Sequence, residues 1–252
     1  MLGQDVLLEK LNGIVEKNVL PRFIIITGER GSQSGEIAPY IAEILDAEYI
    51  GLSDVKADTI RKMVSDAYIQ TSTIVYGINN ADDMSVQAKN SLLKVTEEPP
   101  NKVYFVMTLE DKSNTLHTIL SRATVYEMCR CTPEDILSYI SSYDIKNGYG
   151  DVISEVCTTP GEADLLISCD IDKFYNYVDD FVNKVSGING AEAFTLASDI
   201  SVKDGDEKYD MPLFFKLFQY ICLENAKNQN TNEDAAYYCK AVILAGTYLK
   251  DL

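Results

Sequence analysis

A glycine-rich loop from Gly28 to Gly35, with Gly31 near its middle, joins a short apolar run to a predicted helix. In an α/β unit this is the place where backbone N–H groups can bind phosphate. The working pattern, G-x-x-x-x-G-K-[ST], adds a lysine that neutralises the phosphates and a hydroxyl that holds magnesium. Counted from Gly28, the second glycine is replaced by Gln33, the lysine by Ser34 and the hydroxyl residue by Gly35. The residues therefore predict a degenerate phosphate loop, a strand–turn–helix connection that holds no ligand.

A second place that nucleotide chemistry would need lies after the apolar run that ends at Ile78. An acid there would hold magnesium, and its neighbour would polarise the attacking water. The two positions carry Asn79 and Asn80, which are neutral, bind a hard cation weakly and cannot accept a proton. Glu29 and Glu36 also place negative charge beside the loop. We therefore expect no ATP or magnesium cofactor and no ATP hydrolysis.

These segments are positioned by predicted strands and helices that alternate along the first half of the chain. Short apolar runs predict buried strands, and apolar residues near a 3.6-residue spacing predict helices. The alternation predicts a doubly wound α/β domain with a parallel sheet. In chain order we expect a helix over residues 1–20, a strand at Phe23–Thr27, a helix at Glu36–Leu45, a strand at Tyr49–Leu52, a helix at Thr59–Tyr68, a strand at Thr73–Ile78, a helix at Val86–Glu97, a strand at Val103–Thr108, a helical turn at Thr115–Leu120 and a strand at Thr124–Met128.

The pattern becomes helical at Thr132, where an N-cap residue is followed by proline and two acids. Two or three short helices are expected up to Ser168. Further helices are predicted at Phe174–Val185, Ala191–Ile200, Met211–Ala226 and Glu233–Leu249. The sequence thus predicts three domains: an α/β domain at 1–130, a small helical lid at 131–168 and an all-α domain at 169–252.

Composition limits the kind of protein this chain is. With 46% hydrophobic and 24% charged residues it is typical of a globular protein, and its net charge of -17 argues against a broad surface for duplex DNA. No apolar run reaches the roughly 18 residues that a membrane span needs. The N-terminus lacks the features of a signal peptide, so we expect a cytoplasmic protein. The scattered cysteines and the single histidine, His117, predict no metal site.

The segment Asn90–Pro100, read together with Ile74–Asp82, closely resembles the second half of the nucleotide site in clamp-loader ATPases of the AAA+ class. In that family the strand ends in an Asp-Glu pair, the Walker B acids, at the positions of Asn79 and Asn80. Over about the first 165 residues the chain is similar to the delta-prime subunits of bacterial DNA polymerase III clamp loaders. The resemblance implies a P-loop fold of the AAA+ type, followed by a helical lid and a collar-like helical domain.

A further motif of that family is Leu-x-Thr-Ile-x-Ser-Arg, which the segment Leu116–Arg122 resembles. In the family this arginine enters the ATP site of the neighbouring subunit as an arginine finger, which stabilises charge on the transferring phosphate. The resemblance therefore implies a trans-acting role for Ser121 and Arg122, although Ala123 stands where the family has cysteine. The alternative is a surface arginine that pairs with nearby carboxylates and adds little to stability.

The resemblance also locates two sensor-like positions. Thr108, at the end of the fourth predicted strand, matches the polar sensor. Glu162 stands where the family usually has a lid arginine that contacts the subunit's own nucleotide. The four zinc-binding cysteines that many relatives carry in the first domain are absent, because no cysteine precedes Cys129.

The function that the resemblance implies is a subunit of the DNA polymerase III clamp loader that does not hydrolyse ATP itself. Its partners would be gamma/tau and delta subunits in a hetero-oligomer and, through the complex, the sliding clamp and primed DNA. Two alternatives stay open. One is an active clamp-loader-type ATPase with an atypical phosphate loop, and the other is a scaffold of the same fold that has lost clamp loading.

Overall fold

The computed structural model describes residues 1–145, 148–185, 210–228 and 237–243. Contacts divide the chain into two compact units. The first holds residues 1–131 together with 159–161, and the second holds 132–158 with the rest of the chain from 162 on. Each unit is described by itself.

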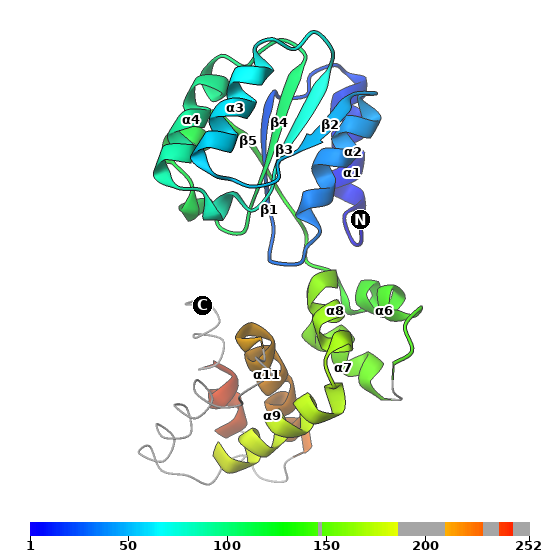
Figure 1. The fold of residues 1–252 in the computed structure, drawn as a ribbon. Helices are drawn as coiled ribbons and strands as arrows, with labels where there is room; N and C mark the ends of the chain where they lie inside the picture. Colours follow the sequence, from blue (N-terminus) through cyan, green and yellow to red (C-terminus); the bar gives the residue numbers. More distant parts are fainter. Residues whose placement is uncertain (146–147, 186–209, 229–236, 244–252) are drawn as a thin grey trace. The chain divides into compact units, whose positions relative to one another are not determined.

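The first unit is built on a five-stranded, fully parallel sheet (Figure 1) with the strand order β2-β3-β4-β1-β5. The central strand β1 pairs on one side with β4, where Ile24 lies opposite Val106, and on the other with β5, where Ile24 lies opposite Thr124. The strands are β1 (Phe23–Thr27), β2 (Glu48–Gly51), β3 (Ile74–Ile78), β4 (Val103–Leu109) and β5 (Thr124–Glu127).

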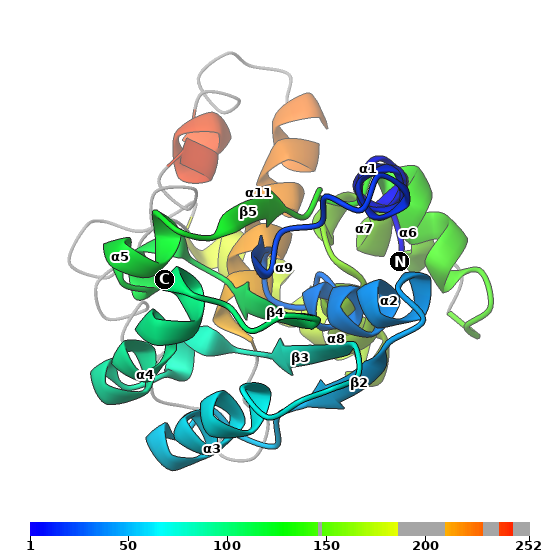
Figure 2. The same ribbon diagram turned by 90° about the horizontal axis from the view of Figure 1, so that it is seen from above.

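Helices cover both faces of this sheet, with α3 and α4 on one side and α1 and α2 on the other, as Figure 2 shows from above. Alternate residues of β1 serve the two layers: Phe23 and Ile25 pack in the core with α3 and α4, and Ile24 and Ile26 pack with α1 and α2. The helical elements are α1 (Asp5–Glu16), η1 (Ser34–Glu36), α2 (Ile37–Ile44), α3 (Ala57–Ala67), η2 (Ala81–Asp83), α4 (Val86–Glu97), η3 (Lys112–Asn114) and α5 (His117–Leu120).

Local sequence explains where helix α4 begins and ends. The Ser85 side chain accepts a hydrogen bond from the Ala88 N–H, which caps the first turn. The helix ends at Glu97, just before Pro99 and Pro100, because proline cannot continue the backbone hydrogen bonding. Most of the segment Asn90–Pro100 therefore lies in the second half of this capped helix.

The second unit is helical in all its described elements. Helix α6 starts with a complete capping box between Thr132 and Asp135, with Pro133 at its first position, as the sequence predicted. Aromatic side chains join α9 to α11, because the Phe181 ring contacts the rings of Phe214 and Phe218. The helices are α6 (Pro133–Ile140), α7 (Tyr149–Val156), α8 (Pro160–Ser168), α9 (Ile171–Val185) and α11 (Met211–Asn228), and residues 237–243 are also helical.

The predicted fold class is confirmed: a doubly wound parallel α/β part is followed by helices. Two elements, Phe23–Thr27 and Val86–Glu97, were predicted to the residue, and α1 and α5 are shorter than expected. The helix expected at Ala191–Ile200 lies outside the described residues, and so does most of the one at Glu233–Leu249. The separation of a lid from a third domain at 168/169 stays a prediction. In the described part of the chain, no helix is long and apolar enough to span a membrane.

Candidate functional site

A pocket of about 560 Å³ lies at the carboxyl ends of β1, β3 and β4, in the first unit. Ligands bind at this edge of the sheet in doubly wound α/β folds. The charged side chains among its lining are the carboxylates of Glu29, Asp82, Asp83 and Glu110 and the guanidinium of Arg30. This excess of negative charge opposes a polyphosphate, which carries the same sign. A pocket therefore lies where nucleotides bind in such folds, but its lining carries the charge that repels phosphate.

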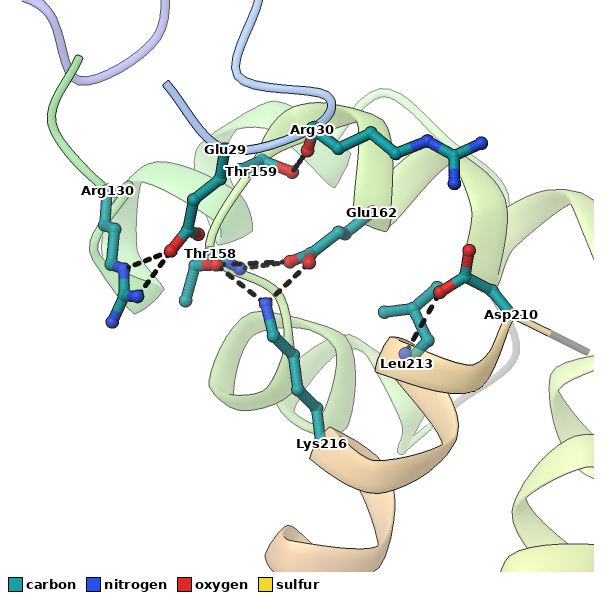
Figure 3. Close-up of polar contacts among 9 residues, drawn as sticks. All are labelled: Glu29, Arg30, Arg130, Thr158, Thr159, Glu162, Asp210, Leu213 and Lys216. Carbon is teal, nitrogen blue, oxygen red and sulfur yellow. Dashed lines mark hydrogen bonds and ion pairs between the residues drawn. The ribbon is translucent and has the colours of Figure 1, made fainter. Parts of the chain in front are cut away.

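The loop after β1 keeps the bent backbone of a phosphate loop, with Gly31 at φ 80° and Gln33 at φ 62°. Two carbonyls of this loop accept hydrogen bonds from residues 159–161, which belong to the same unit. Thr159 Oγ1 donates to the Arg30 carbonyl at 3.1 Å (Figure 3), and the Gly161 N–H donates to the Gly31 carbonyl at 3.0 Å. A Cβ atom on Gly161 would lie 2.6 Å from the Gly31 Cα, so this close approach requires glycine.

Glu29 is the second loop residue, and its carboxylate lies beside Arg130, just beyond β5 (Figure 3). Arg130 donates to Glu29 Oε1 from Nε at 2.8 Å and also from Nη2. The sequence predicted that Glu29 would repel a ligand phosphate. In the structure the same carboxylate forms an ion pair with Arg130 of the chain itself.

Asn80, in the pair predicted to be a degenerate Walker B, adopts the left-handed conformation, with φ 54° and ψ 48°. Asparagine tolerates this region better than most residues. The Asn80 N–H donates to Thr108 Oγ1 at 3.0 Å, so the sensor-like threonine, which is 3% exposed, contacts the neighbouring strand end. Asn79 places its Oδ1 in a buried position where it has no hydrogen-bond partner, and its side chain lies 3.4 to 3.6 Å from where a Gly35 Cβ would be.

Asp82 holds the loop that follows β4. Its carboxylate accepts from the N–H of Glu110 at 2.7 Å, the N–H of Asp111 at 3.1 Å and the Asn114 side chain at 3.1 Å. Burial acts to raise the pKa of Asp82, but these hydrogen bonds outweigh it and hold the pKa below its usual value. Burial and then the nearby Asp82 charge raise the pKa of Glu110. The Asp82 carboxylate therefore stabilises the loop after β4, and its oxygens accept hydrogen bonds from three donors.

The donor set of the pocket does not fit a magnesium–nucleotide complex. A lysine is absent from its lining, and Asn79 and Asn80 supply no carboxylate at the end of β3. Across the described residues, no three His, Cys, Asp or Glu side chains gather in a way that could hold a metal ion. We therefore derive no chemical step through a bound nucleotide in this pocket.

Arg122 lies after α5, on the α4–α5 side of the first unit. Its Nη1 donates to the Thr118 carbonyl at 2.8 Å, and its Nη2 lies 3.0 Å from Glu97 Oε1 at the end of α4. The Arg122 side chain is 38% exposed and that of Glu97 is 54% exposed. Ser121 Oγ donates to the Thr118 carbonyl at 3.1 Å. The surface ion pair that the sequence left open as the alternative is thus present, and the role in trans stays a prediction.

Glu162, the other sensor-like residue, forms a cluster within the second unit (Figure 3). Its Oε2 accepts from the Thr158 N–H at 2.9 Å and from Thr158 Oγ1 at 3.2 Å. Lys216 Nζ, from α11, lies 2.5 Å from Glu162 Oε1 and 3.0 Å from Thr158 Oγ1. The two charged side chains are 22% and 14% exposed, so this pair is largely buried. Glu162 therefore joins α8 to α11.

The sequence did not reveal the partners of these residues. Each ion pair joins residues that are far apart in sequence, so residue spacing does not predict it. The pairs are Glu29–Arg130, Glu97–Arg122 and Glu162–Lys216. One local signal was available for Glu97, because an acid at a helix C-terminus is unfavourable in the field of the helix dipole and calls for a nearby cation.

Comparison with solved structures identifies the class of fold. The RuvB Holliday junction branch migration motor of Thermotoga maritima is similar over 94% of this chain and 82% of its own, with a TM-score of 0.54 and 15% sequence identity. At this identity the likeness concerns the fold alone, which is that of AAA+ proteins.

Sequence comparisons find a family model and relatives that match parts of the chain. Residues 46–131 match the model of the family described as DNA polymerase III, delta subunit. The DNA polymerase III subunit delta' of Bacillus subtilis is 28% identical over 45% of this chain and 35% of its own length. The gamma/tau subunit of Mycoplasma genitalium is 22% identical over 92% of this chain and 49% of its own. The chain is thus similar to clamp-loader proteins, with the family model matching residues 46–131, and it spans about half or less of the length of these relatives.

Proposed function

We propose that the chain is a subunit of the DNA polymerase III clamp loader that does not hydrolyse ATP and that supplies Arg122 to a neighbouring subunit's ATP site. It would act in the cytoplasm, in a hetero-oligomer with gamma/tau and delta subunits that loads the sliding clamp onto primed DNA. The names of the relatives, DNA polymerase III subunits delta' and gamma/tau, support this assembly.

The observation that carries the proposal is the accessible guanidinium of Arg122. It is 38% exposed, so a phosphate on another subunit can reach it without unfolding the chain. A planar guanidinium binds phosphate oxygens with two parallel hydrogen bonds and stabilises charge that develops on a transferring phosphoryl group. The chain's own pocket supports the other half of the proposal, because carboxylates line the place of the phosphates.

The first experiment substitutes the arginine. In a complex reconstituted with gamma/tau and delta subunits, Arg122→Ala should lower clamp- and DNA-stimulated ATP turnover by at least about tenfold per affected site, since an arginine finger contributes still larger factors in the best cases. A matched control is Arg61→Ala, which removes another exposed arginine in an ion pair, with Asp58 on α3. Equal turnover in the two variants would refute the trans role of Arg122.

A second experiment addresses the chain's own pocket. Titration of the isolated full chain with Mg-ATP in a calorimeter should give no binding heat, because a lysine is absent from the pocket lining and four carboxylates line it. Saturable binding would favour an ATPase with an atypical phosphate loop. Failure to co-purify with gamma/tau would favour a scaffold that has lost clamp loading.

A further inference from the structure

We propose that Glu97 is a positioning residue that holds the guanidinium fork of Arg122 in the orientation in which it meets the neighbouring nucleotide. The inference rests on the function proposed for Arg122 and adds a second residue, from a different helix, to the same surface. Three features of the first unit carry it.

The first feature is that the fork has two anchors on two elements. Nη1 donates to the Thr118 carbonyl of α5 at 2.8 Å, and Nη2 lies 3.0 Å from Glu97 Oε1, at the last residue of α4. A planar fork held at two nitrogens has a fixed plane, whereas one anchor leaves it free to rotate. Its remaining N–H groups then point in set directions.

The second feature is the fixed backbone beneath the side chain. The Arg122 N–H donates to the Ile119 carbonyl at 3.0 Å, and the Ile119 side chain is fully buried. Because the backbone is held, the two contacts of the guanidinium set where the fork lies. Glu97 supplies the contact that comes from a different helix.

The third feature is that Glu97 is poorly placed for the stability of its own helix. A carboxylate at the C-terminal end of α4 opposes the helix dipole, and the basic residue of the same turn, Lys94, lies over the Tyr68 ring at 4.6 Å from its centroid. A residue that breaks a local rule points to a role outside the local structure. Here that role is the Arg122 contact.

The pair also has the right strength for a positioning device. Both side chains are more than a third exposed, and such ion pairs are weak. The weak pair therefore does not withhold the arginine from a triphosphate, which binds the N–H groups that the two anchors leave over. Glu97 holds the plane of the fork while those groups meet the nucleotide.

The test uses the reconstituted complex and the variant Glu97→Gln, which keeps the shape of the side chain and removes its charge. Glu98→Gln is the matched control, because it makes the same change at the next residue, also exposed at the end of α4. We expect Glu97→Gln to lower kcat for ATP by roughly two- to fivefold, the factor that corresponds to the loss of one exposed ion pair, while KM stays the same. Glu98→Gln should match the wild type, and Glu97→Asp should recover part of the loss.

The double variant Glu97→Gln with Arg122→Ala separates this inference from the proposed function. If Glu97 acts through Arg122, its substitution has no further effect once the arginine is gone. An equal loss in both backgrounds would overturn the positioning role, and so would wild-type or raised turnover of the Glu97→Gln complex. If Arg122→Ala itself leaves turnover unchanged, the proposed function fails and the positioning role fails with it. A normal Glu97→Gln beside an impaired Arg122→Ala overturns the positioning role alone.

Discussion

The residues predicted for the chain's own nucleotide site and the arginine predicted to act on a neighbour's site use their polar groups in opposite ways. Glu29 and Asp82, which line the pocket, and Glu162, in the second unit, all bond to donors of the same chain. Arg122 is held by two contacts at an exposed surface and keeps part of its fork accessible. Side chains of the first kind stabilise the fold, and a side chain of the second kind can serve another molecule. Substitutions at the two places should therefore separate stability from activity.

The largest effect on stability is expected at Lys216. Lys216→Met leaves the Glu162 carboxylate, only 14% exposed, without its cation and should lower the free energy of unfolding by about 3 kcal/mol. Urea unfolding monitored by circular dichroism measures this loss. The control is Lys227→Met, which removes a lysine of the same helix whose pair with Glu224 is exposed and should leave unfolding nearly unchanged. Equal losses of unfolding free energy in the two variants would show that the buried Glu162–Lys216 pair stabilises the fold no more than the exposed pair does.

A smaller loss is expected where the loop after β1 meets Gly161. Gly161→Ala places a Cβ 2.6 Å from the Gly31 Cα, and backbone at both sides must shift, at a cost of about 2 kcal/mol in the free energy of unfolding. Gly150→Ala is the matched control, since its Cβ meets nothing within 4 Å and alanine favours the helix α7. The control should raise stability by about 0.5 kcal/mol. A neutral Gly161→Ala would mean that the loop is not held at this point.

At Asp82 the expected loss depends on pH. Asp82→Asn weakens three accepted hydrogen bonds and should cost about 1 kcal/mol at neutral pH. Because the folded chain lowers the pKa of this carboxyl, its contribution is present above the unfolded pKa and disappears as the pH falls through the folded pKa. Unfolding curves of variant and wild type should thus converge in acid. Asp83→Asn, which makes the same change at another carboxylate of the pocket, is the matched control.

The smallest effect on stability is expected at Arg122. Arg122→Ala removes an exposed ion pair and one hydrogen bond and should change the free energy of unfolding by less than about 0.5 kcal/mol. The same variant has the largest expected effect on turnover in the complex. A large loss of stability would place Arg122 among the structural residues and remove the contrast between the two regions.

Much of the fold could be predicted because the buried strands are short apolar runs. Phe23–Thr27 is fully buried along its length, and so is Ile74–Ile78. Such strands, covered on both faces, carry their signal in every residue. The ends of Val86–Glu97 were also predictable, from the proline pair that follows it.

The contacts of the site could not be predicted in the same way. The Glu162–Lys216 pair joins residues 54 positions apart, and Arg122 meets Glu97 across two helices. These contacts depend on how helices pack, which periodicity does not specify. The left-handed backbone at Gln33 is also unforeseen, because glutamine has no preference for it.

The left-handed conformation of Asn80 limits which side chains the end of β3 accepts without strain. Asparagine occupies this region at little cost, whereas glutamate there would add roughly 1 kcal/mol of backbone strain. Asn80→Glu, which would place a carboxylate at the end of β3, would therefore lower stability whatever chemistry the carboxylate supplied.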